Sequence, residues 1–310
     1  MPNSPAIEIE QVTKTFGSQV AVNRLDLTVP SGSIYGFIGP NGSGKTTTLR
    51  MILRIYQPDH GRVTVLGQST GRTADDRVGY LPEERGLYKR MKVNDLLTYY
   101  ARLKGCYNCQ GKIDRWLERL GAQDWAKKRI DALSKGMAQK VQFIAAVVAE
   151  PQLLILDEPF SGLDPVNMEM LKDAILEVQK QGTTIIFSTH DMETAERLCD
   201  TVFMIFKGNK VLDGSVDQIK NQFAKRQFEV GFDQPCDLRG RPKLTHVTNQ
   251  GDVIHFQLAS ADHMAAHRSN ATPLESASQV LAYLQTLGSV NHFRSQRPTL
   301  HDIFVQIASN

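Results

Sequence analysis

One segment of the chain combines glycines, a lysine and two threonines at a spacing suited to holding a phosphate chain. Residues 39–47 read GPNGSGKTT and fit the pattern GxxxxGK[ST]. Glycines let successive backbone N–H groups turn inward around phosphate oxygens, and a following helix adds its positive end. Lys45 supplies a positive charge for the β- and γ-phosphates, and Thr46 is placed to ligate Mg²⁺. The predicted nucleotide-binding residues are Gly39, Pro40, Asn41, Gly42, Ser43, Gly44, Lys45, Thr46 and Thr47.

A second chemical feature is a pair of adjacent carboxylates further along the chain. Residues 153–158 read LLILDE, which predicts a short buried strand ending in Asp157 and Glu158. Asp157 is suited to holding Mg²⁺, directly or through water, and Glu158 to orienting and polarising an attacking water. Two carboxylates at the end of one buried strand would repel each other without a nearby cation. Together with the phosphate loop, this pair predicts nucleotide hydrolysis.

The strands and helices that would hold these residues alternate over the first 220 residues. Apolar runs at residues 33–38, 153–156 and 183–188 predict buried strands, and residues 45–53 predict a helix that follows the phosphate loop. Continuous apolar strands that alternate with helices favour a parallel sheet covered on both faces. Further strands are predicted at residues 7–13, 25–29, 63–66, 202–206 and 210–212.

Two regions depart from this alternating pattern. From residue 93 to about 149 the apolar side chains have helical spacing, with Leu96 and Leu103 on the same predicted face. After residue 219 the character changes to alternating strands and one amphipathic helix, which predicts a small α+β domain. Its strands are predicted at residues 228–232, 253–258 and 290–294, and its helix at 276–287. We therefore expect a nucleotide-binding domain at 1–220, with a helical subdomain at about 86–150, and an accessory domain at 221–310.

The composition narrows the class of protein. The chain has 310 residues, a formal net charge of +3, 41% apolar and 22% charged residues, which is typical of globular proteins. This small charge balance does not predict a nucleic-acid partner, because such partners normally need a clustered basic face. No run of about 18 apolar residues appears, so any work at a membrane would go through a partner chain. The first residues lack the regions of a signal peptide, so we expect the chain in the cytoplasm.

Cysteine and histidine spacing raises two further hypotheses. Cys106 and Cys109 form a CxxC pattern, but a zinc site would need a second ligand pair and no second CxxC exists, so we expect free thiols. Six of the eight histidines follow residue 220, and His263 and His267 have helical i,i+4 spacing. We expect solvated surface histidines rather than a metal site.

Several further motifs carry a resemblance to one family. Residues 133–137 read LSKGM, precede a helical run and resemble the signature loop of ABC ATPases, which is usually LSGGQ. Phe16 matches the aromatic residue that stacks on adenine, Glu83 takes the place of the Q-loop glutamine, and His190 matches the switch histidine. The motifs fall in the family's order and the resemblance covers residues 6 to 220. The signature residues are Ser134, Lys135, Gly136 and Met137, and the D-loop residues are Ser161, Gly162, Leu163 and Asp164.

The resemblance implies an ABC-type P-loop fold with a mixed sheet, and ATP and Mg²⁺ as cofactors. Thr46, Glu83 and Asp157 would ligate Mg²⁺, and Glu158 and His190 would be catalytic. Family members work as head-to-tail pairs, in which each ATP lies between one subunit's phosphate loop and the other's signature loop. The resemblance thus implies a second ATPase subunit. A second copy of this chain is preferred, and a related subunit remains open.

The sequence departs from the usual family pattern at three positions. Glu83 replaces glutamine, Lys135 replaces the first signature glycine and Met137 replaces glutamine. A carboxylate at 83 can still ligate Mg²⁺ or water, and Gly136 still permits close backbone approach. The stretches GYLPEERGLY and LSKGMAQKVQF resemble the ATPases paired with ABC-2 type permeases, including sodium-efflux and drug-efflux systems. This implies an exporter whose polytopic permease is a separate chain and holds the ATPase at the inner membrane face.

Other functions are less consistent with the sequence. A GTPase would carry an Asn-Lys-x-Asp motif, which is absent. The main alternative is a soluble ABC ATPase that acts on a macromolecular complex. Translation-type members resemble fusions with two phosphate loops, and this chain has one, while DNA-repair members insert long coiled coils that are lacking here. A regulatory nucleotide sensor would lose hydrolysis, against which Glu158 and His190 argue.

Overall fold

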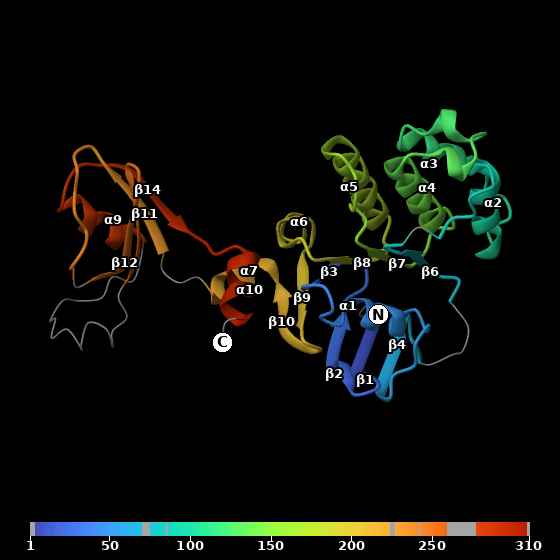
Figure 1. The fold of residues 1–310 in the computed structure, drawn as a ribbon, viewed down its shortest axis with the longest axis horizontal. Coiled ribbons are helices and arrows are strands. Elements are labelled where there is room, and N and C mark those ends of the chain that lie inside the picture. Colours follow the sequence, from blue (N-terminus) through green and yellow to red (C-terminus); the bar gives the residue numbers. More distant parts are fainter. Residues whose placement is uncertain are drawn as a thin grey trace. The chain divides into compact units, whose positions relative to one another are not determined.

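The chain forms two compact units, which are described separately. The computed structural model describes residues 4–69, 75–84, 86–223, 227–241, 243–258 and 277–308. The first unit is Met1–Val216 and the second is Asp217–Asn310 (Figure 1). The predicted histidine pair, His263 and His267, lies outside the described residues. Within the described part, no helix is long and apolar enough to cross a membrane.

The first unit begins with a four-stranded antiparallel sheet. Its strands, in the order β2-β1-β4-β5, are β1 (Ile7–Phe16), β2 (Gln19–Val29), β4 (His60–Val65) and β5 (Gln68–Ser69). Alternate residues of β2, such as Leu25, Leu27 and Val29, are buried, as expected for a strand with one face on the core. Both β1 and β2 are longer than the strands predicted at residues 7–13 and 25–29, and the turn between them places Phe16 at the very end of β1.

A six-stranded mixed sheet forms the centre of the first unit. Its order is β10-β9-β3-β8-β7-β6, and all neighbouring strands are parallel except β9 and β10. The strands are β3 (Ile34–Ile38), β6 (Val78–Leu81), β7 (Leu153–Asp157), β8 (Thr184–Thr189), β9 (Thr201–Phe206) and β10 (Asn209–Ser215). Every residue of β3, β7 and β8 is buried, which explains why their sequences are mostly apolar. The expected α/β fold is confirmed.

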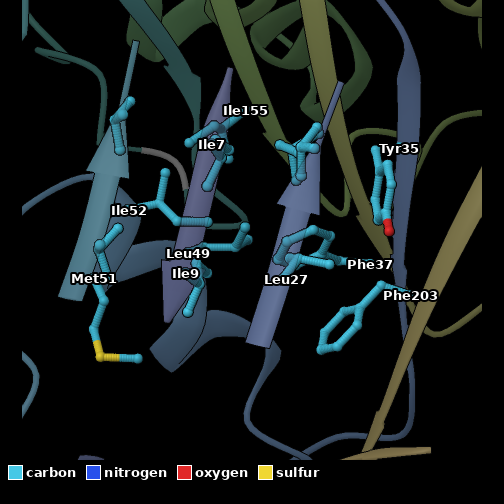
Figure 2. Close-up of a cluster of buried hydrophobic side chains, with 14 of the residues drawn as sticks. Ile7, Ile9, Leu27, Tyr35, Phe37, Leu49, Met51, Ile52, Ile155 and Phe203 are labelled. Carbon is cyan, nitrogen blue, oxygen red and sulfur yellow. The ribbon is translucent and has the colours of Figure 1, made fainter. Parts of the chain in front are cut away.

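Helix α1 (Lys45–Ile52) packs into the core that the two sheets share. Leu49, Met51 and Ile52 of the helix belong to one buried cluster with Ile7 and Ile9 of the antiparallel sheet. Figure 2 shows side chains of β1 and β2 facing those of Phe37, Ile155 and Phe203 from the central sheet. This burial fixes where the N-terminus of α1 meets the end of β3, and that junction is the phosphate loop.

Three helices lie between β6 and β7, in the region for which the sequence predicts a helical subdomain (Figure 1). They are α2 (Val93–Leu103), α3 (Gln110–Arg119) and α4 (Lys135–Val147), with short 3₁₀ turns at Gln123–Trp125 and Ile130–Ala132. Helix α2 buries Leu96, Leu97 and Ala101 at helical spacing. Leu103, which the sequence placed on that face, is instead 54% exposed, because α2 ends there.

Two more helices follow the acidic strand and β8, and neither was predicted. Helix α5 (Pro165–Lys180) follows β7 and has Pro165 at its first position, where a missing N–H costs nothing. Helix α6 (Met192–Leu198) follows β8 and packs on β3 and β8. Each begins with an aspartate cap, Asp164 for α5 and Asp191 for α6. Both loops that carry candidate site residues therefore end in firmly capped helices.

The second unit contains an antiparallel sheet of order β12-β13-β11-β14. Its strands are β11 (Gln227–Phe232), β12 (Leu244–Gln250), β13 (Val253–Leu258) and β14 (Val290–Gln296). The helices of its described residues are α7 (Val216–Gln222), which begins at the last residue of the first unit, α9 (Ala277–Gln285) and α10 (Leu300–Ala308). Phe228 stacks on both Phe256 and Phe293, and these rings with Val280 and Leu284 of α9 help build a separate apolar core.

The close packing of α4 on β6 depends on Gly79. A Cβ at that position would lie 2.4 Å from the carbonyl oxygen of Ala146, so helix and strand backbones are nearly in contact. We expect Gly79→Ala to lower the free energy of unfolding by about 1–3 kcal/mol, because the backbone must shift. Gly111→Ala in α3 is the matched control, since a Cβ there meets nothing within 4 Å. Chemical denaturation of both variants checks this, and equal stabilities would contradict it.

Candidate nucleotide-hydrolysing site

The phosphate loop joins β3 to α1 and is held tightly against neighbouring backbone. Gly39 has φ +149°, and a Cβ there would lie 2.3 Å from the carbonyl oxygen of Ile205. Gly44 has φ +114°, and a Cβ would lie 2.5 Å from the carbonyl oxygen of Ala21. Both positions combine a backbone conformation that favours glycine with no room for a side chain. The glycines of the motif therefore serve the packing of the loop as well as its approach to phosphate.

Lys45 is the buried cation of this loop. Its side chain folds back so that Nζ donates to the carbonyl oxygen of Gly39 at 2.6 Å, and the residue is only 6% exposed. Burial lowers the pKa of its ammonium group, while the nearby carboxylates of Glu158, Asp157 and Glu83 act in the opposite direction. A buried ammonium that bonds only carbonyl oxygens is suited to bind an anionic group in the cavity beside it.

A cavity of about 270 Å³ lies over the loop. It is lined by residues Phe16, Gln19, Ala21, Asn41, Gly42, Ser43, Gly44, Lys45, Thr46, Thr47, Glu83, Asp157 and Glu158. The hydroxyl of Ser43 is buried there and finds no hydrogen-bond partner among the described residues. An unpaired buried hydroxyl beside a buried ammonium fits a site built for phosphate oxygens, which accept from both.

Phe16 stands at the edge of this cavity. Its ring is 45% exposed and packs edge-to-face on Tyr56, with ring centroids 5.3 Å apart. The ammonium of Lys14 lies 5.5 Å from the same ring. An aromatic ring that is fixed from behind and open in front offers a planar group a stacking surface. The strand β1 thus brings the predicted adenine platform to the phosphate loop.

Asp157 ends β7 inside the cavity and is only 2% exposed. Burial raises the pKa of its carboxyl above the ordinary value, and the charges of Glu83 and Glu158 add to the rise, while Lys45 opposes it. The cavity therefore gathers the carboxylates of Glu83, Asp157 and Glu158 around one buried ammonium. Such a site is stabilised by a bound cation.

Glu158 has an unusual backbone and a well-anchored side chain. Its φ is +49°, in the left-handed region, and its N–H donates to the carbonyl oxygen of Ser188 at 2.9 Å. Oε1 accepts from the backbone N–H of His190 at 2.9 Å and lies 2.6 Å from its Nδ1, while Oε2 accepts from Thr189 at 3.2 Å. Left-handed backbone in a non-glycine residue costs about 1–3 kcal/mol and is concentrated at functional sites.

The signature and D-loop residues lie together, outside the lining of this cavity. Ser134 caps α4, and its hydroxyl accepts from the N–H of Met137 at 3.2 Å. A Cβ on Gly136 would lie 3.4 Å from the side chain of Leu163 in the D-loop. The N-terminus of α4 is thus formed and exposed, with the D-loop beside it, and none of these residues is in the lining of the phosphate-loop cavity given above.

Two glutamines of α4 connect it to the acidic loops, and sequence reasoning missed both. Gln139 is buried and donates to the carbonyl oxygen of Pro159 at 2.9 Å, next to Glu158. Gln142 is buried and donates to the carbonyl oxygen of Pro82 at 3.3 Å, next to Glu83. Their helical i,i+3 spacing next to the apolar residues of α4 was the available signal.

Comparison with known proteins identifies the class. The ABC transporter family matches residues 22–161, and the C-terminal domain of DrrA1-3-like ATP-binding proteins matches residues 214–308. An uncharacterized ABC transporter ATP-binding protein of Bacillus subtilis is 40% identical over 97% of each chain. A Nod factor export ATP-binding protein I of Rhizobium sp. is 34% identical, covering 84% of this chain and 88% of its own.

A solved structure of an ATP-binding subunit of an ABC transporter has a TM-score of 0.64 and 29% identity, covering 70% of this chain and 93% of its own. The chain therefore belongs to the ABC transporter ATP-binding proteins, a family that binds and hydrolyses ATP.

We expect Glu158→Gln to keep ATP affinity and to cut ATP turnover by about 10²–10⁴, the effect of losing a positioned base. The amide retains the shape and can still accept from the N–H of His190. Steady-state phosphate release and nucleotide titration check both parts. Glu196→Gln on α6 is the control and should leave turnover unchanged. Turnover within twofold of wild type would remove Glu158 from the catalytic role.

The buried carboxyl of Asp157 makes stability depend on pH. Its folded-state pKa is raised, so the folded chain holds the proton more strongly than the unfolded chain does. This contribution is present at low pH and is lost as the pH rises through the folded pKa. We therefore expect Asp157→Asn to unfold at a higher temperature than wild type at pH 7, with a smaller difference near pH ~4.

Thermal unfolding without nucleotide measures this effect, and the exposed Asp124→Asn is the control. If the variant were less stable than wild type by the same margin at pH 7 and at pH ~4, the buried carboxylate of Asp157 would not destabilise the folded chain, and the prediction would be wrong.

Proposed function

We propose that this chain is the ATP-hydrolysing subunit of a membrane exporter and that two such subunits enclose ATP between them. The observation that carries the proposal is the meeting of the phosphate loop, Asp157 and Glu158 in one cavity. Export is supported by the relative named for Nod factor export and by the DrrA-like match at residues 214–308. On this proposal residues 1–220 are the ATPase domain and 221–310 an accessory domain.

In this account the phosphate loop binds and orients the nucleotide. Backbone N–H groups of the loop and Lys45 would hold the phosphates, with the hydroxyl of Ser43 as a further donor, and Phe16 would stack on the base. Thr46, Asp157 and Glu83 are oxygen donors of the kind that suits Mg²⁺. Among the described residues, no three His, Cys, Asp or Glu side chains form a metal cluster. Mg²⁺ commonly takes one or two carboxylates with substrate phosphates, which fits this donor set.

Hydrolysis on this account depends on Glu158 and its neighbours. The carboxylate would accept a proton from the attacking water, so that the water oxygen bonds to the γ-phosphorus as the bond from that phosphorus to the bridging oxygen breaks and ADP leaves. The N–H of His190 and the hydroxyl of Thr189 fix both carboxylate oxygens in place. The imidazole of His190, with 60% of its side chain exposed, would hold that carboxylate from the outside.

The second half of the site would come from another subunit. Ser134 and Gly136 stand at an exposed helix N-terminus, where backbone N–H groups and the helix dipole favour an anion. Lys135 is exposed beside them and adds a cation to this terminus. The cavity over the phosphate loop does not include these residues in its lining. A head-to-tail pair would bring one subunit's signature loop to the other's nucleotide.

The permease would dock in a groove between the helical subdomain and the central sheet. The groove has a volume of about 360 Å³, and Tyr80, Pro82, Leu87, Tyr100 and Gln142 are among its lining residues. Gln142 links it to the carbonyl oxygen of Pro82, beside Glu83, so a bound partner could report on the nucleotide site. The chain would thus work on the cytoplasmic face of the membrane, held there by a polytopic permease.

We expect a polytopic membrane protein to co-purify with the chain from a gentle detergent extract of its own cells. Ile55 lines the groove and is 57% exposed, so Ile55→Asp should weaken the association without unfolding the chain. Tyr107→Asp, at a 77% exposed position outside the groove lining, is the control and should behave as wild type. Recovery of a ribosome or a nucleic acid in place of a membrane protein would overturn the exporter assignment.

A further inference from the structure

The helical subdomain is far more basic than the rest of the chain. Residues 86–149 contain 13 lysines and arginines against five aspartates and glutamates, whereas the whole chain has 36 against 33. The remainder of the chain is therefore net acidic. Such an asymmetry between parts of one chain points to an anionic partner for the basic part.

Much of this charge lies on a two-stranded ribbon formed by segments far apart in sequence. The N–H of Val93 donates to the carbonyl oxygen of Lys128 at 3.0 Å. The N–H of Ile130 donates to the carbonyl oxygen of Met91, also at 3.0 Å. The N–H of Asp131 donates to the carbonyl oxygen of Lys89, also at 3.0 Å. The basic ribbon, as we define it, carries the exposed side chains of Lys89, Arg90, Lys92, Lys127, Lys128 and Arg129.

The backbone of the ribbon is fixed while its basic side chains are left open. Val93 and Ile130 are buried and anchor the two segments to the subdomain. Arg129 pairs with Asp131 at 2.5 Å, but within the described part of the chain no ion pair joins Lys89, Arg90, Lys92, Lys127 or Lys128 to an acid. These cations are thus available to an outside partner.

Two of the charges oppose each other directly. Lys92 and Arg129 are bridge partners in the antiparallel pairing. Like charges at opposed positions of paired strands are destabilising. Asp131 offsets the charge of Arg129, and an anionic surface laid over the ribbon would offset the charge of Lys92 in the same way.

Two tyrosines lie at the start of the ribbon. Tyr88 is 53% exposed and Tyr99 39% exposed, and their rings meet edge-to-face with centroids 5.7 Å apart. The hydrogen bond between the two phenols raises the pKa of Tyr99. Rings locked together in this way are poorly placed to stack individual bases. Amphipathic tyrosine rings beside lysines and arginines are typical of surfaces that meet the membrane interface.

We propose that the basic ribbon binds the anionic phospholipid headgroups of the membrane. The ribbon and the groove are neighbours in sequence. Leu87 and Tyr100 line the groove, and the residues next to them, Tyr88 and Tyr99, flank the ribbon. This proposal rests on the proposed exporter function, which places the chain at the membrane that contains the permease. Lipid contact would hold the helical subdomain against the bilayer while the groove binds the permease.

The test measures sedimentation of the full chain with two kinds of vesicle, phosphatidylcholine alone and phosphatidylcholine with about one third phosphatidylglycerol. We expect binding only to the anionic vesicles. Changing Lys89, Arg90, Lys127 and Lys128 together to Gln should weaken it by about fivefold per charge removed. Binding should also be lost at about 1 M salt, where the Debye length is about 3 Å.

A matched control variant removes four exposed charges elsewhere in the first unit, at Arg24, Arg62, Lys180 and Arg197. It should bind anionic vesicles as wild type does. The variant with Lys89, Arg90, Lys127 and Lys128 changed to Gln should keep the ATPase activity of wild type when no vesicles are present. The groove variant Ile55→Asp should also bind vesicles normally, which separates failure of this proposal from failure of the exporter assignment.

Three results would overturn the proposal. The first is no preference for anionic vesicles at low salt, and the second is equal loss of binding in the ribbon and control variants. The third is tighter ribbon-dependent binding of a duplex or single-stranded oligonucleotide than of vesicles at 0.15 M salt, which would make the ribbon a nucleic-acid surface.

Discussion

The concentration of charge at the end of β7 is the constraint on which the rest of this structure depends. Asp157 is buried beside Glu158 and near Glu83, and Lys45 is the buried ammonium among them. Burial shifts the pKa of Asp157 upward and that of Lys45 downward, because the charged form of each group is less stable in the protein interior than in water. Such an arrangement of buried charges is suited to binding phosphate oxygens and a cation together.

The surrounding elements keep this strained arrangement in register. Helix α1 is fixed by apolar burial between the sheets, which sets the position of Lys45. Glu158 is held in a left-handed conformation by bonds to Ser188, Thr189 and His190, all at the end of β8. Helix α4 reaches the acidic loops through buried glutamines, so the N-terminus of α4 and the groove are mechanically connected to the carboxylates. These contacts offer a physical route between nucleotide and partner.

The sequence predicted the parts of the site that lie within single segments. The phosphate loop and the Asp157–Glu158 pair were found because their residues are contiguous and follow apolar strands. The contact between Glu158 and His190 required the pairing of β7 with β8, and His190 was reached only through family resemblance. The basic ribbon was missed for the same reason, because its segments are far apart and the overall charge of +3 conceals it. Strand β6 and helices α5 and α6 were missed because their apolar patterns are short or interrupted by polar residues.

The central claim is that the exposed N-terminus of α4 completes a neighbour's nucleotide site. Sedimentation velocity of the Glu158→Gln variant with and without ATP and Mg²⁺ tests it most directly. The account predicts a monomer without nucleotide and a dimer with it. The dimer should be lost when Ser134→Arg is added and retained with Gln123→Arg, an exposed position of the same subdomain. A chain that stays monomeric at every ATP concentration, alone and with its co-purified permease, would contradict the shared site.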